Sequence, residues 1–344
     1  MKKALLLCLT LMAALFGFAQ QQLATLLHND SIHVFYGVGA LQQAHAAAVN
    51  GDVITLSGGS FNSVNITKAV TIRGAGMYPD SIAQTMPTIL VGNFTITVPQ
   101  DSNYWLTLEG LYHSQTVKYQ TLYNPVFIKC FFNSITYDNS STSRMNDARF
   151  INCIIKLFGN ATANNTYTAQ NTQFYNSVIL DGLSNECNDQ LINCIARINN
   201  GLSDLYHKTI INSIVYESSS NGYNNGVTSF NSIGINTSTS YGGTYSYYDI
   251  SSAGGIHNLH NYTSYAQVFK TFRGTYSDGI DFHLQDNIAA TILGTDSTQV
   301  GIYGGQCPFD PSVRNPLIGK ATVGRTTTPQ GKLEVDIEVI SEAE

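Results

Sequence analysis

The chain has 344 residues, of which 12% are charged, and its formal net charge at pH 7 is −6. A nucleic-acid partner requires a basic surface, so this charge argues against one. The low charge, together with 29 glycines and 20 tyrosines, is typical of many short strands joined by polar turns rather than of amphipathic helices.

The first residues form a targeting segment. Two lysines precede an apolar run from Ala4 to Phe16, and small residues follow up to Ala19. This arrangement predicts a signal peptide over residues 1–19, with cleavage near Ala19. The apolar run is too short to span a bilayer, and no later stretch is apolar enough. We therefore expect a protein that is secreted or held in the cell envelope, without a membrane span.

The mature chain is expected to open with an end cap over residues 20–50. Ser31 to Tyr36 has the composition of a strand, and Leu41 to Val49 is the one convincing helix-forming run. Gly51 follows this helix and supplies a left-handed C-terminal cap. A strand is predicted directly after it, from Asp52 to Leu56.

The passage around this helix resembles a known family. The sequences AAAVNGDVITLSGGSF at 46–61 and ITKAVTIRGAG at 66–76 are similar to the start of a right-handed parallel β-helix of the pectin-lyase-like superfamily. The resemblance implies an all-β solenoid, predicted over 51–305, with a short N-terminal α-helical cap. Such a cap has a physical reason, because the first coil would otherwise expose an unpaired strand edge and an open core.

Six copies of one short pattern occupy residues 127–234. Successive copies are 23, 24, 17, 19 and 19 residues apart, which is typical of solenoid coils. Their third position reads Lys129, Asn152, Asn176, Asn193, Asn212 and Asn231. We expect this asparagine column at the bend between strands, because asparagine tolerates left-handed backbone and can bond to the next asparagine. Lys129 should lie near the margin of the column, since an unpaired buried charge is costly.

Two further columns of the repeat have structural interpretations. Cysteine and serine alternate directly after the asparagine, as in Cys153 and Ser177, which predicts small buried side chains in a core. Five cysteines remain after cleavage, and an odd number argues against a disulfide framework. The next position is expected to form a continuous core stripe of Ile154, Val178, Ile195, Ile214 and Ile233.

The C-terminal third carries a second resemblance. The sequences DFHLQDNIAA at 281–290 and LGTDSTQVGIYGG at 293–305 resemble the closing coils of secreted β-helix proteins from Bacteroidetes-type bacteria. Three prolines then interrupt regular structure. From Leu333 to Val339 apolar and acidic residues alternate, which indicates a half-buried strand. We expect residues 306–344 to form a C-terminal β cap on the last coil.

The favoured functional prediction is binding of carbohydrate without catalysis, and without a cofactor or metal. Sugars stack on aromatic faces while polar side chains satisfy their hydroxyl groups. A tyrosine-rich stretch supplies both kinds of group, and its candidate ligand-binding residues are Tyr241, Tyr245, Tyr247, Tyr248, Tyr262 and Tyr265. The other interpretation is that these tyrosines cover the outer face of the solenoid. The expected partner is a polysaccharide or cell-surface glycan, bound by a monomer.

The alternative is a polysaccharide lyase that cleaves an acidic glycan by β-elimination. The superfamily includes such lyases, and Lys156 and Arg197 share one repeat column where a basic side chain would act as the catalytic base. Ca²⁺ would then neutralise the carboxylate of the substrate. The same column also holds Leu180, Tyr216 and Ile235, a mixture unlike an active site. Binding therefore ranks above catalysis.

Overall fold

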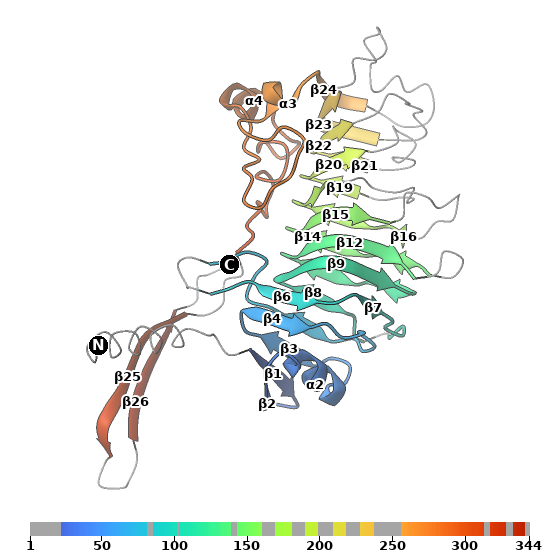
Figure 1. Ribbon diagram of the computed structural model, residues 1–344. Coiled ribbons are helices and arrows are strands. Elements are labelled where there is room, and N and C mark those ends of the chain that lie inside the picture. Colours follow the sequence, from blue (N-terminus) through green and yellow to red (C-terminus); the bar gives the residue numbers. More distant parts are fainter. Residues whose placement is uncertain are drawn as a thin grey trace, which may run out of the picture.

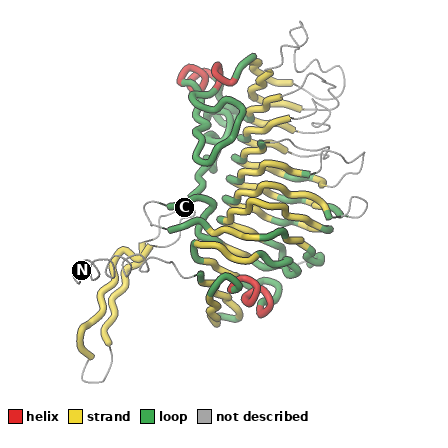
Figure 2. Tube along the Cα trace, viewed as in Figure 1, coloured by secondary structure: helices red, strands yellow, loops and turns green. Residues whose placement is uncertain are grey.

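The computed structural model describes residues 22–80, 85–101, 103–138, 143–159, 169–180, 190–198, 209–217, 228–236, 256–312, 317–327 and 333–340. The chain is a parallel β-solenoid, as the sequence predicts, with its coils stacked along a rod (Figures 1 and 2). The predicted signal peptide lies outside the described residues. None of the helices in the described ranges is long and apolar enough to cross a membrane.

The N-terminal end of the rod is closed by a hairpin and a helix. Strands β1 (Leu23–His28) and β2 (Ser31–Tyr36) pair antiparallel, and β1 also pairs with β3 (Val53–Leu56), the first strand of the solenoid. Helix α2 (Ala40–Ala47) lies at the same end, drawn in blue in Figure 1. Its buried Ala40, Leu41 and Ala44 join the core of the solenoid, so the predicted helical cap is confirmed.

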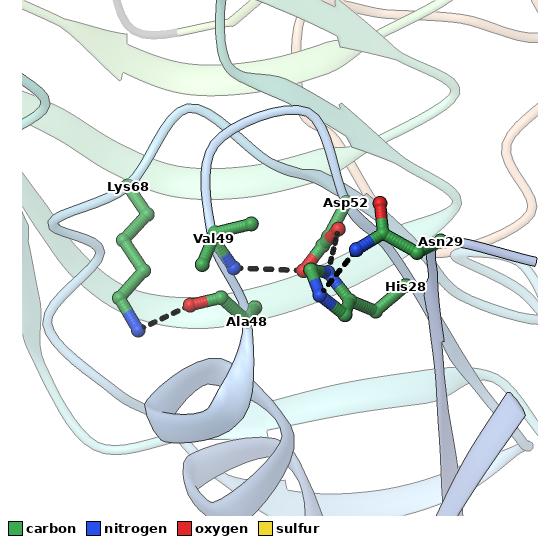
Figure 3. Close-up of polar contacts among 6 residues, drawn as sticks. All are labelled: His28, Asn29, Ala48, Val49, Asp52 and Lys68. Atoms are coloured by element: carbon green, nitrogen blue, oxygen red, sulfur yellow. Dashed lines mark hydrogen bonds and ion pairs between the residues drawn. The ribbon is translucent and has the colours of Figure 1, made fainter. Parts of the chain in front are cut away.

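Polar contacts fix the end of α2 to the first coils (Figure 3). Lys68 Nζ donates to three backbone oxygens at the end of the helix, at 2.7 to 2.9 Å. These are carbonyl groups that a helix leaves unpaired at its C-terminus. Asp52 accepts a hydrogen bond from Val49 N at 2.7 Å, and its Oδ1 lies 2.9 Å from His28 Nδ1. The cap is therefore held by specific polar contacts as well as by apolar packing.

Two faces of parallel strands run along the rod. The first face contains β3, β5 (Thr71–Arg73), β8 (Thr107–Glu109), β11 (Val126–Ile128), β14 (Arg149–Ile151), β17 (Gln173–Tyr175), β19 (Gln190–Ile192), β21 (Thr209–Ile211) and the start of β23 (Thr228–Asn236). The second face contains β4 (Gly59–Asn62), β6 (Thr88–Val91), β9 (Leu111–Tyr119), β12 (Phe131–Tyr137), β15 (Ile154–Phe158), β18 (Val178–Ile179), β20 (Ile195–Ile198), β22 (Ile214–Glu217) and the end of β23.

The remaining strands complete the coils. Strand β7 (Phe94–Ile96) pairs with the end of β9, and β24 (Ile256–Tyr262) pairs with β23 as the last parallel strand. A small third sheet contains β10 (Leu122–Tyr123), β13 (Met145–Asn146) and β16 (Ala169–Gln170). The three coils that contain β10, β13 and β16 therefore have three sides.

The interior core repeats from coil to coil. The rings of Phe127, Phe150 and Phe174 stack with centroids 4.5 and 5.0 Å apart. Beside them, Cys153 and Ser177 are fully buried, as the sequence predicts. The cysteines at 130, 153 and 194 are free, and each thiol contacts a backbone oxygen of the preceding coil. This column is part of the core and forms no disulfide within the described residues.

The asparagine column has the predicted left-handed backbone, with φ between 41° and 54° at all six positions. Its side chains bond elsewhere than expected. Asn176 Nδ2 donates to two backbone oxygens in the segment 302–304, at 2.9 and 2.7 Å, and Asn212 exchanges hydrogen bonds with Thr295. The expectation of bonding from one asparagine to the next is wrong, because a later part of the chain lies against this column.

Residues 265–312, named here the strap, run back along the outside of the second face (Figures 1 and 2). The strap is mostly loop and contains the short helices α3 (Tyr265–Val268) and α4 (Asp286–Thr291). Its apolar side chains, Val300 and Ile302 among them, bury the predicted isoleucine and valine stripe from outside. That stripe is core, but it belongs to a second core between strap and solenoid rather than to the interior.

Glycines allow the strap to approach the solenoid closely. A Cβ atom on Gly294 would lie 2.7 Å from Cγ of Asn212, and one on Gly301 would lie 2.9 Å from Cδ1 of Ile214. Side chains at these positions would push the strap away. The glycine-rich passage 293–305, expected to form closing coils, instead docks along the side of the rod. At the end of the strap, Lys129 Nζ donates to Ser312 O at 2.7 Å.

The last strands differ from the expected cap. Strands β25 (Leu317–Thr327) and β26 (Leu333–Ile340) pair antiparallel with each other in a separate two-stranded sheet. In Figure 1 this hairpin, in red, projects from the side of the rod and does not lie on the last coil at β24. The alternation of apolar and acidic residues from Leu333 to Val339 thus predicted the strand correctly, but not where it lies relative to the last coil.

Candidate functional site

The two basic residues of the lyase prediction lie on the second face. The strand register places Lys156, Leu180 and Arg197 in one column on successive coils. Leu180 is buried in the core shared with the strap and separates the two cations. Lys156 Nζ lies 5.9 Å from the ring centroid of Tyr276, a strap residue. The fold therefore puts a covered apolar side chain, and not a shared open groove, between these two groups.

Tyr276 belongs to a polar cluster between strap and solenoid. Its hydroxyl oxygen lies 2.5 Å from that of Tyr78, and it donates to Asp278 Oδ1 at 3.2 Å. Burial raises the pKa of Tyr78 to about 12 and raises that of Tyr276 as well. Both phenols are protonated at neutral pH, whereas a general base works best with a pKa near the working pH. The hydrogen bonds of this cluster therefore hold the strap against the solenoid, and neither phenol is suited to act as a base.

The structure describes only part of the tyrosine-rich stretch. Tyr262 ends β24 and is partly buried against the strap core. The ring of Tyr265 packs edge to face on Tyr216, with centroids 5.5 Å apart, and on Phe272 at 5.7 Å. These two tyrosines pack the strap onto the solenoid. The other candidates, Tyr241, Tyr245, Tyr247 and Tyr248, lie outside the described residues.

A hollow lined by polar side chains lies at the corner where the chain enters the first face. Its volume is about 410 Å³. It is lined by Asn124, Asp147, Arg149, Asn171, Gln173 and Gln190. We name this hollow the amide trough, because four of its six lining residues carry a side-chain amide.

The repeat of the solenoid builds the amide trough. Three lining residues are the first residues of β14, β17 and β19, which pair in parallel register. Because the next residue of each strand points into the core, these three face outward. The other three stand two residues before β11, β14 and β17, on left-handed corners with φ between 50° and 56°. Four successive coils contribute, so the trough is roughly 14 Å long at about 4.8 Å per coil.

Hydrogen bonds between lining residues hold the amides in place. Asn171 Nδ2 donates to Asp147 Oδ1 at 3.1 Å, and Gln173 Nε2 donates to Gln190 Oε1 at 3.4 Å. Arg149 is exposed and adds one positive charge to the one negative charge of Asp147. The lining therefore offers many donors and acceptors but no net charge.

Two tyrosines neighbour residues that line the amide trough. Tyr175 OH donates to Gln173 Oε1 at 3.1 Å, and its ring is partly exposed. Tyr123 directly precedes the lining residue Asn124 and is 38% exposed. Aromatic faces beside side-chain amides are the combination that sugar rings and hydroxyl groups require.

The amide trough was missed by sequence reasoning, although a signal for it exists. Its corner residues Asn124, Asp147 and Asn171 each stand five positions before one of the first three members of the asparagine column. Asn188 stands five positions before the fourth member, Asn193. This second polar column has the same spacing as the first. In sequence it resembles ordinary turn residues, so only the fold shows that it lines a hollow.

Comparison with models of known protein families, with curated proteins and with solved structures finds no match to this chain. Within the described ranges, no group of three or more histidine, cysteine, aspartate or glutamate side chains could hold a metal ion.

Proposed function

We propose that this chain is an exported carbohydrate-binding protein and that the amide trough is its binding site. Export is supported by the signal-like residues 1–19, and membership of the pectin-lyase-like superfamily by the passages 46–61 and 66–76. The passage 281–305 supports a relationship to Bacteroidetes-type β-helix proteins. Carbohydrate binding rests on one observation, the amide trough with a tyrosine next to two of its lining residues, Tyr175 beside Gln173 and Tyr123 beside Asn124.

The chemistry of the amide trough matches that of a sugar. Each sugar hydroxyl donates and accepts hydrogen bonds, and a side-chain amide does both as well. The amides are held on strand ends and corners of a rigid rod, so little conformational entropy is lost when a ligand binds. Tyr175 and Tyr123 supply aromatic surface for the apolar faces of the rings.

The lyase alternative has weaker support. A lyase needs a base in an open groove, with a group that neutralises the uronate carboxylate. Lys156 instead lies over the ring of Tyr276, and the buried Leu180 separates it from Arg197. We therefore retain binding without catalysis as the proposed function.

Substitution of Gln173 tests the proposal. Gln173 contacts both Gln190 and Tyr175, so Gln173→Ala removes an amide and releases a flanking ring. On a glycan array followed by calorimetry of the best ligand, we expect affinity to fall by about five- to tenfold, as for the loss of one or two hydrogen bonds. Asn103→Ala, at an exposed asparagine outside the trough, is the matched control and should bind like the wild type. Equal affinity of both variants, or no glycan binding by the wild type, would contradict the proposal.

A further inference from the structure

We infer that the ligand is a linear, uncharged polysaccharide that occupies the amide trough and a second hollow beside it. The inference rests on the proposed function and adds the length and the charge of the ligand. It follows from the way that the two hollows meet and from the charges that line them.

The second hollow, named here the Tyr123 hollow, has a volume of about 470 Å³. Its lining includes Gln100, Gln120, Tyr123 and Asp138. Gln120 Nε2 donates to Asp138 Oδ2 at 3.2 Å. This hollow therefore repeats the combination found in the amide trough, which is side-chain amides, one carboxylate and an exposed tyrosine.

The two hollows border each other. Tyr123 lines one of them and Asn124, the next residue, lines the other. The lining begins at Thr97, before β8, and ends at Gln190, which begins β19. The first face has four steps from β8 to β19. At about 4.8 Å per coil the combined site is roughly 19 Å long. A single sugar ring fills only part of that length, whereas an extended chain would contact both hollows with Tyr123 between them.

The charges of the two hollows select against an anionic chain. Among the described residues, the carboxylate of Asp138 pairs with Lys118 Nζ at 3.6 Å. Asp147 shares the amide trough with Arg149. An acidic polysaccharide is held by an excess of positive charge, and each hollow has one acidic group for each basic group near it. An uncharged chain avoids the repulsion by both carboxylates and still uses the amides and the rings.

Oligosaccharide length is the direct variable to test. Calorimetry would measure the affinity of the full chain for β-1,4-linked gluco-, manno- and xylo-oligosaccharides of two, four and six units. We expect affinity to rise by about tenfold or more from two to six units in the series that binds, because the second hollow then adds contacts to an already bound ligand. Tyr123→Ala should reduce this rise, because it loses more affinity for the six-unit ligand, which spans both hollows, than for the two-unit ligand. Tyr123→Phe keeps the ring and should retain the rise.

Tyr104→Ala is the matched control, since Tyr104 is 47% exposed and lines neither hollow.

A six-unit oligogalacturonate probes the charge, and we expect it to bind at least about tenfold more weakly than the uncharged ligand of equal length. Affinity that does not depend on length, or an equal loss at all lengths in Tyr123→Ala, would overturn the two-hollow site and leave glycan binding intact. Tighter binding of the oligogalacturonate would overturn the assignment of an uncharged ligand. If no oligosaccharide or array glycan binds, the proposed function itself is wrong.

Discussion

Asn212 serves the solenoid and the strap at the same time. Its φ of 50° turns the chain between two strands. Its buried side chain accepts from Thr295 N at 2.8 Å and donates to Thr295 Oγ1 at 3.2 Å. An aspartate could not donate the second bond, and most other residues would disfavour the backbone conformation. Backbone conformation and docking chemistry together explain why asparagine recurs in this column.

We expect Asn212→Ala to lower the free energy of unfolding by about 2 kcal/mol more than Asn124→Ala does, because two hydrogen bonds of a buried side chain are lost. Asn124 has the same φ of 50° and is exposed. Its replacement therefore carries the backbone cost alone, about 1 kcal/mol. Urea denaturation of both variants measures the difference. Equal losses would show that the contacts between asparagine and strap contribute nothing to stability.

Two buried histidines make the fold sensitive to acid. Burial lowers the pKa of His45, and the charge of Lys68 lowers it further; burial also lowers the pKa of His113. Because the folded-state pKa lies below the unfolded value of 6.5, the unfolded chain binds these protons more readily. Their effect on stability is absent above about pH 6.5 and becomes destabilising as the pH falls below it.

The free energy of unfolding should therefore decrease between pH 7.5 and pH 5.5, and His45→Gln should flatten part of that decrease. His33→Gln, at an exposed histidine of β2, should leave the profile unchanged. Denaturant titrations at several pH values provide the measurement. A stability that rises toward pH 5.5, or an unaltered profile in His45→Gln, would contradict this assignment.

At the scale of the element, helix α2 depends on a residue outside it. Lys68 Nζ donates to three backbone oxygens at the end of the helix. The ammonium group satisfies carbonyl groups and also faces the negative end of the helix dipole. The helix is only eight residues long, too short to be stable without such contacts.

Lys68→Met should lower the free energy of unfolding by about 1–2 kcal/mol, since it removes charge-assisted hydrogen bonds and keeps much of the apolar stem. Lys118→Met is the control. The side chain of Lys118 is half exposed, and its Nζ forms an ion pair with Asp138 at 3.6 Å. Exposed ion pairs of this kind contribute about 0–1 kcal/mol to stability. Thermal or urea denaturation of both variants would show the contrast. A smaller effect at Lys68 than at Lys118 would refute the capping role.

The coils and their end cap could be predicted from the sequence because their signals are local. Repeat spacing, the helix-forming run before Gly51 and the left-handed preference of asparagine each report on neighbouring residues. The strap could not be predicted in this way. Its contacts join Asn176 and Asn212 to residues 83 to 128 positions later, and no short-range pattern encodes them.

One sequence signal of the strap was available. In a half-buried strand, apolar residues alternate with polar ones. The strands of the second face instead carry consecutive apolar residues, such as Ile154 and Ile155, and such runs indicate that both faces of the strand are buried. The amide trough is different in kind, because its residues resemble solvated turn residues until the fold stacks them into one hollow.

At the scale of the whole molecule, the faces of the solenoid differ in how accessible they are to a ligand. The strap covers the second face from β9 to β23 and forms a core of its own against it, so the basic column of the lyase alternative is partly enclosed. At the corner of the first face, by contrast, polar residues of successive coils form the amide trough and the adjoining Tyr123 hollow. The central claim is that carbohydrate binds at this corner.

A crystal structure of the protein with a bound uncharged oligosaccharide tests that claim most directly. We expect electron density for sugar rings in the amide trough, stacked on Tyr123 or Tyr175 and bonded to the amides of Gln173 and Asn171. Sugar bound beside Lys156 and the strap, or bound only by the tyrosines at 241–248, would contradict the account.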